Sequence, residues 1–249
     1  MEYSPKKMQK LLEDNAFGFK KKFGQNFIID ENIINNIIKV SDLSKDTLVI
    51  EIGPGAGSLT RKLALNAGFV LCYEIDKALK SILDNNLSEF DNVKVIYNDF
   101  LVENIASELK NYNFNNVCVV ANLPYYITTP IVTKIIDDKI PIDKMVIMVQ
   151  KEVGDRFKAV PNSKDYSSLS VFLNYYFDIK KELDVSKNVF LPRPNVDSIV
   201  ISLTKKEKRN ICLNENLFFQ LIRDAFRQKR KTLKNNLKGY NTEKIEEIL

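Results

Sequence analysis

The chain has 249 residues, of which 45% are hydrophobic and 28% are charged, and its formal net charge is +5. This length and composition are ample for a packed core and suit one large domain, or a large domain with a small one. No apolar run approaches the length that spans a bilayer, and residues 1–10 lack the apolar stretch of a secretory signal, so we expect a cytoplasmic protein without membrane attachment.

Histidine is absent, which excludes a Ser-His-Asp triad, a Cys-His dyad and the usual histidine-containing zinc sites. The cysteines Cys72, Cys118 and Cys212 lie far apart in sequence and form no C-x-x-C pair, so we expect reduced, structural thiols. We therefore expect no metal site, and any chemistry has to proceed without an imidazole base.

Strands and helices alternate along most of the chain. Residues 1–30 form an irregular leader in this interpretation, and the spacing of isoleucines predicts a helix over 31–40 with Asp30 as its cap. The expected strands are 48–52, 69–73, 93–97, 117–121 and 144–149, and the expected helices between them are 58–65, 77–86 and 129–137. This order predicts an α/β fold, a Rossmann-like, doubly wound and mostly parallel sheet.

The pattern changes after residue 150. Residues 172–176 and 198–204 have strand-like composition, with a proline-containing loop at 190–195 between them, and the sequence becomes helical and basic beyond Lys205. We therefore expect a leader over residues 1–30, a Rossmann-like domain over 31–204 and a small helical domain over 205–249.

Basic residues gather in two places. One is a lysine run at residues 20–22, and the other spans residues 223–238, where there are seven basic residues and one acidic residue. Such clusters are typical of surfaces that bind a phosphate backbone, although a solvated helix face would have the same composition. The candidate RNA-binding residues are Lys20, Lys21, Lys22, Arg227, Lys229, Arg230, Lys231 and Lys234.

A glycine-rich turn at residues 53–57 follows the first strand, and Glu74 lies 21 residues after Gly53, at the end of the second strand. Such a turn lets a ligand approach the backbone, and an acidic residue at that spacing can accept both ribose hydroxyls. The third glycine comes four residues after the first, which departs from the dinucleotide fingerprint and favours the turn of S-adenosylmethionine-dependent methyltransferases. The candidate cofactor-binding residues at the strand ends are Gly53, Gly55, Gly57, Glu74, Asp99, Phe100 and Asn122.

The segment Asn122-Leu-Pro-Tyr125 follows the fourth strand and resembles the N/D-P-P-Y/F-type motif of amino-methyltransferases. The Asn122 amide oxygen and the Leu123 carbonyl can accept hydrogen bonds from an adenine N6 amine and aim its lone pair at a methyl group. Pro124 fixes the backbone, and Tyr125 offers a face on which the base stacks, worth roughly 1–3 kcal/mol. Catalysis of this kind depends on positioning and electrostatics and needs no strong base.

Several longer motifs together resemble the bacterial small-subunit ribosomal RNA adenine dimethyltransferase family, over about residues 21–237. They are Lys22-Phe-Gly-Gln-Asn-Phe27, Glu51-Ile-Gly-Pro-Gly-Ala-Gly57, Asn122-Leu-Pro-Tyr-Tyr-Ile-Thr-Thr-Pro130, Gln150-Lys-Glu-Val153, Phe190-Leu-Pro-Arg-Pro-Asn-Val-Asp-Ser198 and Phe226-Arg-Gln-Lys-Arg-Lys-Thr-Leu233. The resemblance implies dimethylation of two adjacent adenosines in a hairpin near the 3′ end of the small-subunit rRNA, and a role in small-subunit biogenesis.

The resemblance also assigns further residues. It implies that Asn26 and Ile28 contact S-adenosylmethionine, that Gln25 and the leader help to close over it, and that Phe190 lies across the target base from Tyr125. The implied partner is the small-subunit rRNA within an immature small ribosomal subunit, and we expect the enzyme to act as a monomer.

Other functions remain open from the sequence. The large-subunit rRNA methyltransferases of the antibiotic-resistance type share the fold and chemistry, although their loop tends to have isoleucine where this chain has Leu123. A non-catalytic ribosome assembly factor could keep the same fold. A DNA adenine methyltransferase is disfavoured because no separate target-recognition domain is visible, and a nicotinamide dehydrogenase because the glycine spacing differs and no histidine is present.

Overall fold

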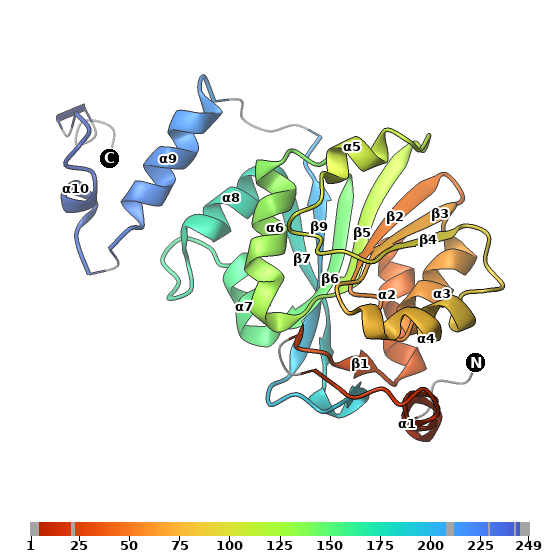
Figure 1. Cartoon of the computed structure of the whole chain (residues 1–249). Helices are drawn as coiled ribbons and strands as arrows, with labels where there is room; N and C mark the ends of the chain where they lie inside the picture. The colour runs from red at the N-terminus through yellow and green to blue at the C-terminus, as the bar shows by residue number, and fades with distance from the viewer. Residues whose placement is uncertain (1–4, 21–22, 208–211, 229, 242, 245–249) are drawn as a thin grey trace. The chain divides into compact units, whose positions relative to one another are not determined.

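A computed structural model of the chain describes residues 5–20, 23–207, 212–228, 230–241 and 243–244. Its centre is a seven-stranded sheet in the order β4-β3-β2-β5-β6-β9-β7 (Figure 1). The pairs from β4 to β6 are parallel, and β9 is antiparallel to β6. The strands of this sheet are β2 (Thr47–Ile52), β3 (Phe69–Tyr73), β4 (Val93–Ile96), β5 (Asn116–Asn122), β6 (Lys144–Gln150), β7 (Phe177–Val185) and β9 (Ser198–Lys205). The predicted α/β class with a mostly parallel sheet is confirmed.

Helices cover both faces of the sheet (Figure 1). The helices in chain order are α1 (Pro5–Asp14), α2 (Glu31–Ser41), α3 (Ser58–Asn66), α4 (Lys80–Asn86), α5 (Ile105–Leu109), α6 (Thr128–Asp137), α7 (Lys151–Phe157), α8 (Ser168–Tyr176), α9 (Glu215–Ala225) and α10 (Leu233–Asn236). Short 3-10 turns are η2 (Lys77–Leu79), η3 (Tyr125–Ile127) and η4 (Lys187–Val189). No helix of the described residues is long and apolar enough to cross a membrane.

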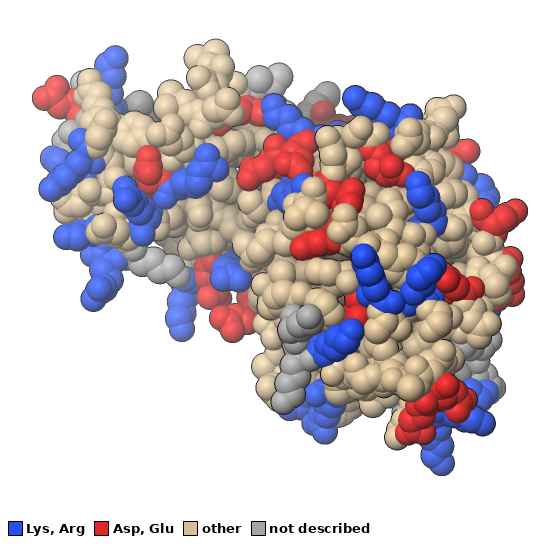
Figure 2. Space-filling view, viewed as in Figure 1, with Lys and Arg blue, Asp and Glu red and all other residues tan. Residues whose placement is uncertain are grey.

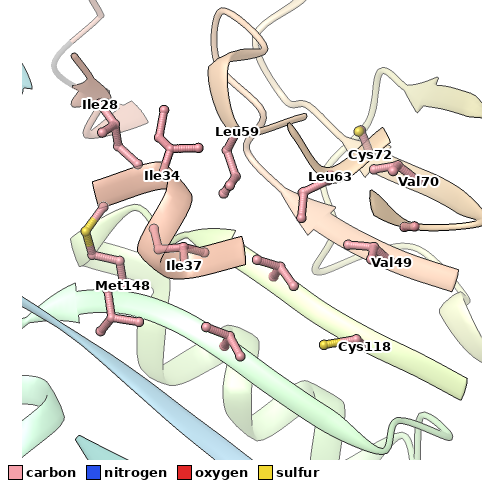
Figure 3. Packing of buried hydrophobic residues seen from close by; sticks show 14 of the residues in the cluster. Ile28, Ile34, Ile37, Val49, Leu59, Leu63, Val70, Cys72, Cys118 and Met148 are labelled. Atoms are coloured by element: carbon pink, nitrogen blue, oxygen red, sulfur yellow. The ribbon is translucent and has the colours of Figure 1, made fainter. Parts of the chain in front are cut away.

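The main core lies between the sheet and the pair α2 and α3. Ile34 and Ile37 of α2 and Leu63 of α3 are at most 2% exposed, and they pack with Val49 and Val70 of the strands (Figure 3). Asp30 caps α2 as predicted, because its carboxylate accepts hydrogen bonds from the backbone N–H groups of the first turn. This core holds the carboxyl ends of the parallel strands at one edge of the sheet, where ligands bind in such folds.

The leader is more regular than the sequence suggested. Residues Pro5–Asp14 form α1, and Phe27–Ile28 form the short strand β1, which pairs antiparallel with β8 (Phe190–Leu191). The prediction of an irregular leader over 1–30 was therefore wrong in part. The reason is that β1 gains its backbone partner from a segment more than 160 residues later, which local sequence cannot reveal.

The prediction of a strand at 172–176 was wrong, because these residues belong to the helix α8. Ser167 caps the helix by a capping box with Ser170. The aromatic residues of α8 favour strands in isolation, but here they pack on a second helix: the ring centroids of Phe172 and Phe219 of α9 are 4.9 Å apart. Tertiary packing thus decides the conformation.

The chain forms two compact units. Unit 1 comprises Met1–Gly154 and Lys180–Lys205, and unit 2 comprises Asp155–Ile179 and Lys206–Leu249. The second segment of unit 2 starts next to the predicted boundary at residue 205. Its first segment, residues 155–179, was predicted to belong to the Rossmann-like domain. The cause is the aromatic cluster of unit 2, in which α8 contributes Phe172, Tyr175 and Tyr176 and α9 contributes Phe218 and Phe219.

Candidate active site

A pocket in unit 1 lies where β2, β3, β4 and β5 end. The leader turn, the glycine-rich turn and the loop after β5 all contribute to its wall. The predicted site residues that line the pocket are Asn26, Ile28, Gly53, Gly55, Glu74, Asp99, Phe100, Asn122, Leu123, Pro124 and Tyr125. Two predicted residues, Gly57 and Phe190, are not among those that line it. Among the described residues, no group of three or more Cys, Asp or Glu could hold a metal ion.

The glycine-rich turn requires glycine for two different reasons. Gly53, Gly55 and Gly57 have φ values of +70°, +60° and +84°, in the left-handed region that other residues rarely adopt. A Cβ atom on Gly55 would also lie 2.8 Å from the ring of Phe27. Gly57 shapes the turn itself, since its N–H donates to the Pro54 carbonyl and it immediately precedes α3.

Glu74 ties the glycine-rich turn to the end of β3. It is only 4% exposed, its Oε2 accepts from the Gly55 N–H at 3.2 Å, and its Oε1 accepts from the Asp76 N–H at 2.8 Å. Burial raises the pKa of Glu74 to about 7, although these backbone hydrogen bonds oppose the rise. A fixed carboxylate at this strand end can accept hydrogen bonds from a ribose.

Glu51 is a second buried carboxyl group, to which the sequence analysis gave no role. It lines the pocket, is 1% exposed and accepts a hydrogen bond from the Cys72 thiol at 3.6 Å. Burial raises the pKa of Glu51 to about 8, so the group is largely protonated at neutral pH. The signal that could have found it is a lone acidic residue inside an otherwise apolar strand.

Asp99 and Phe100 follow β4 and lie at the pocket wall. The Asp99 Oδ1 accepts from the Leu101 N–H at 2.9 Å, which fixes the turn. Phe100 is 3% exposed, and its ring meets that of Tyr73 edge to face, with centroids 5.4 Å apart. The two residues therefore offer a carboxylate and an aromatic edge at neighbouring points of the pocket.

The loop after β5 is held by hydrogen bonds on both sides. The Asn122 Nδ2 donates to the Asn26 carbonyl at 2.7 Å, and the Leu123 N–H donates to the Met148 carbonyl of β6 at 3.1 Å. The Pro124 carbonyl accepts from the Ile127 N–H at 3.2 Å. This bond uses one of the two Nδ2 protons and fixes the orientation of the amide, whose oxygen can act as an acceptor for a ligand.

A hydrogen bond at the hydroxyl holds the Tyr125 ring in place. Its hydroxyl makes a hydrogen bond of 2.7 Å with the Ser198 hydroxyl, and Ser198 is 1% exposed. Burial raises the pKa of Tyr125, and the bond with Ser198 partly opposes that rise. Ser198 belongs to the motif at residues 190–198, and its hydroxyl orients the Tyr125 ring.

Phe190 lies in the core. The pairing of β1 with β8 puts Ile28 opposite Phe190, and Phe190 is 3% exposed within the same hydrophobic cluster as Ile28. The structure thus brings together the motifs at 22–27 and 190–198, which are far apart in sequence. Stacking of Phe190 on a target base stays a prediction.

The predicted RNA-binding residues fall into different environments. Lys20 forms an ion pair with Asp76, whose Oδ1 is 2.7 Å from the Lys20 Nζ. In unit 2, Arg227, Arg230, Lys231 and Lys234 are exposed, and Figure 2 shows basic side chains over the region of α9 and α10. Lys21, Lys22 and Lys229 lie outside the described residues.

Comparisons with known proteins agree with one another. Residues 16–248 match the family "Ribosomal RNA adenine dimethylase". Over 240 residues the chain is 50% identical to "Ribosomal RNA small subunit methyltransferase A" from Staphylococcus aureus, covering 95% of this chain and 81% of that protein.

Two solved structures are similar throughout the fold. A dimethyladenosine transferase from Plasmodium falciparum is 28% identical with a TM-score of 0.75, covering 87% of this chain and 76% of that one. The 23S rRNA methyltransferase ErmE is 27% identical with a TM-score of 0.70, covering 89% of this chain and 87% of that one.

Proposed function

Because the chain belongs to the ribosomal RNA adenine dimethylase family, we propose that it dimethylates the N6 amines of two adjacent adenosines near the 3′ end of small-subunit rRNA. The methyl donor in this proposal is S-adenosylmethionine. The family identified from the sequence motifs is confirmed, and so is its enzyme class. The small subunit is favoured over the large because identity is 50% to a small-subunit methyltransferase and 27% to ErmE.

The residues at the ends of β2, β3 and β4 suit S-adenosylmethionine. We assign to this cofactor half of the pocket Gly53, Gly55, Glu74, Asp99 and Phe100. The fit rests on the buried Glu74 carboxylate, suited to ribose hydroxyls, and on the close approach that the bare Gly55 backbone permits. Asp99 would accept from the adenine amine and Phe100 would pack beside that ring. Asn26, Ile28 and Asn122 would complete the site, and Gly57 would act through the turn.

The loop after β5 forms what we term the target-base half of the pocket, residues 122–125. When bound, S-adenosylmethionine supplies an activated methyl group on a sulfonium. The Asn122 side-chain oxygen and the Leu123 carbonyl would accept the two N6–H bonds, and this would direct the nitrogen lone pair at that methyl group. Tyr125, fixed by Ser198, would stack on the base, and Phe190 would take the other face only if it leaves its core position.

Rate acceleration in this arrangement comes from position and from fixed dipoles. The observation that supports the proposal is the hydrogen bond from the Asn122 Nδ2 to the Asn26 carbonyl, because with the amide held in this way its oxygen would be the acceptor for the base. Transfer of the methyl group to N6 would break its bond to the sulfonium sulfur and leave a cationic nitrogen, which is a strong acid, so its proton would be lost without a histidine base.

We further propose that unit 2 and two residues of the lysine run, Lys21 and Lys22, bind the rRNA backbone. Arg227, Arg230, Lys231 and Lys234 supply exposed positive charge, and Lys21, Lys22 and Lys229 are expected to add to it. The substrate is an immature small ribosomal subunit, which presents the hairpin in the required shape to a monomeric enzyme in the cytoplasm.

The test is transfer of labelled methyl from S-adenosylmethionine to unmethylated small ribosomal subunits, with large subunits as the control. Digestion and nucleoside analysis should give N6,N6-dimethyladenosine from the small subunit alone. Label confined to the large subunit would instead assign the chain to the resistance-type reaction, and no label in either would leave a binding role only.

A further inference from the structure

Asp76 lies just beyond the proposed cofactor half, and nothing in the sequence analysis assigned it a role. It is 2% exposed, and both of its carboxylate oxygens are occupied. The Lys20 Nζ donates to Oδ1 at 2.7 Å and the Gln25 Nε2 donates to Oδ2 at 2.8 Å. The Lys20 N–H also donates to the Gln25 Oε1 at 2.9 Å, so the two partners of Asp76 are joined to each other.

The same leader residues reach the catalytic loop. Gln25 is followed by Asn26, whose carbonyl accepts the hydrogen bond from the Asn122 Nδ2 at 2.7 Å. Asn26 in turn donates through its own Nδ2 to the Gly24 carbonyl at 3.0 Å. Gly24 packs closely on Tyr126, because a Cβ at this position would lie 3.1 Å from the Tyr126 ring. The turn at 23–26 therefore touches the loop after β5 directly.

Asp76 is also bonded to the cofactor half, because its N–H donates to the Glu74 Oε1 at 2.8 Å. Hydrogen bonds thus link Glu74 to Asp76 and Asp76 to Gln25, the peptide bond joins Gln25 to Asn26, and a further hydrogen bond links the Asn26 carbonyl to Asn122. Burial opposes the charge on Asp76, but the hydrogen bonds from Lys20 and Gln25 lower its pKa overall, so the carboxylate is ionised at neutral pH.

Resting on the proposed function, we infer that Asp76 is a positioning residue for methyl transfer: by holding Lys20 and Gln25 it fixes the turn at 23–26, and this sets the orientation of the Asn122 amide. A buried carboxylate is stable only with its partners in place, so loss of either partner favours release of the turn and hydration of Asp76. The rate of methyl transfer then depends on Asp76, although the contacts of its side chain are with leader residues and with η2.

The competing explanation for Lys20 is direct contact with rRNA phosphates. The net charge of suitable variants distinguishes this explanation from the positioning role. Asp76→Asn raises the net charge of the protein by one, and Lys20→Met lowers it by one. Direct phosphate contact predicts opposite effects of the two substitutions on substrate binding. A positioning role predicts that both slow methyl transfer.

The experiment measures single-turnover methyl transfer to small subunits at saturating S-adenosylmethionine for Asp76→Asn, Lys20→Met and the double variant. We expect each single variant to be about tenfold slower and the double variant to be no slower than the worse single, since the residues act as one unit. Lys80→Met is the matched control, because it removes a lysine from the exposed Lys80–Asp84 pair of α4, and it should transfer at the wild-type rate.

The Asp76→Asn variant keeps a side-chain oxygen that can cap η2, where Asp76 accepts from the Ala78 N–H, so this variant should fold. Melting temperatures check this, and Lys20→Met carries the test if Asp76→Asn does not fold. Wild-type rates in both single variants, or additive losses in the double variant, would overturn the inference. Faster transfer or tighter RNA binding by Asp76→Asn would also overturn it, in favour of direct phosphate contact.

A second readout does not depend on catalysis. The chain has no tryptophan, so Phe19→Trp gives a single tryptophan, which can be excited selectively over the tyrosines, beside Phe27, whose ring centroid is 5.4 Å from that of Phe19. Emission should shift to longer wavelength when Asp76→Asn is added, because the leader leaves its packed position. A shift without methyl transfer by any variant, the wild type included, would contradict the proposed function alone. Methyl transfer by the wild type, together with no shift of emission when Asp76→Asn is added, would contradict the role of Asp76 alone.

Discussion

The cofactor half and the target-base half of the pocket are built by different means. Next to the cofactor half the fold buries two carboxyl groups, Glu74 and Glu51, whose pKa values burial raises to about 7 and about 8. The target-base half, residues 122–125, contains no acidic residue, and backbone and amide hydrogen bonds hold it. Burial of these ionisable carboxyl groups lowers the stability of the fold where the cofactor would bind. The reacting amine would instead be held by neutral dipoles that need no change of protonation.

The largest effect is expected in the target-base half, from Asn122→Ala. Loss of one preorganised acceptor should slow single-turnover methyl transfer about 10²- to 10³-fold. Asn116→Ala is the matched control, because Asn116 lies at the exposed opposite end of β5, and its rate should equal that of the wild type. Near-full transfer by Asn122→Ala would contradict the role given to this loop.

The next effect concerns the buried charge of the cofactor half. The pKa of Glu74 is about 7 in the fold against 4.5 as the ordinary value, so the folded state keeps its proton longer than the unfolded chain. Stability therefore falls as the pH rises from about 4.5 to 7 and stays reduced above that range, by roughly 3 kcal/mol.

Glu74→Gln removes this pH dependence. Denaturant titrations should show the wild type losing free energy of unfolding relative to the variant between pH 5 and pH 8. The direction is opposite to that of a salt-bridged carboxylate such as Asp76, whose pKa is lowered. If the free energies of unfolding of wild type and variant changed with pH in parallel, burial would not be raising the pKa of Glu74.

A smaller effect is expected from the backbone of the cofactor half. Gly55→Ala combines a φ of +60° with a Cβ placed 2.8 Å from the Phe27 ring, and it should lower stability by about 1–3 kcal/mol. Gly18→Ala is the control, because no atom lies within 4 Å of its Cβ position and it should change stability by less than about 0.5 kcal/mol. Equal melting temperatures of the two variants would contradict the close approach at the turn.

The smallest effect should come from Tyr125→Phe. The ring that stacks on the base remains, and only the hydrogen bond to Ser198 is lost, so a rate change of about fivefold is expected, in line with roughly 1 kcal/mol per hydrogen bond. Ser198→Ala should slow transfer similarly, and the double variant should add little further loss. Fully additive losses would mean that the hydroxyl of Tyr125 has a different partner in the reacting complex.

The site was predictable from sequence where it depends on strand ends. Gly53, Glu74, Asp99 and Asn122 each follow an apolar run, and a parallel sheet brings all such ends to one edge, so short-range pattern and topology together were sufficient. The alternation of strands and helices over 31–149 was predicted from local pattern, except for the short helix α5 between β4 and β5.

Contacts between distant segments could not be predicted from such patterns. Asp76 meets Lys20 and Gln25 from 56 and 51 residues earlier, and no local feature links them. Phe190 illustrates the same limit, since the proline-containing segment predicts a loop and the resemblance implies contact with the target base, while the pairing with β1 buries the ring. The aromatic residues of α8 were assigned to a strand because their helix partner, α9, comes about 40 residues later.

Calorimetric titration of S-adenosylmethionine decides whether the two halves of the pocket have separable tasks. Wild type, Asn122→Ala and Glu74→Gln should be titrated at pH 8 in the absence of RNA. We expect Asn122→Ala to keep its affinity for S-adenosylmethionine within about threefold, and Glu74→Gln to lose about tenfold or more. Equal losses in both variants would contradict the division, because the target-base half would then bind the cofactor as strongly as the cofactor half does.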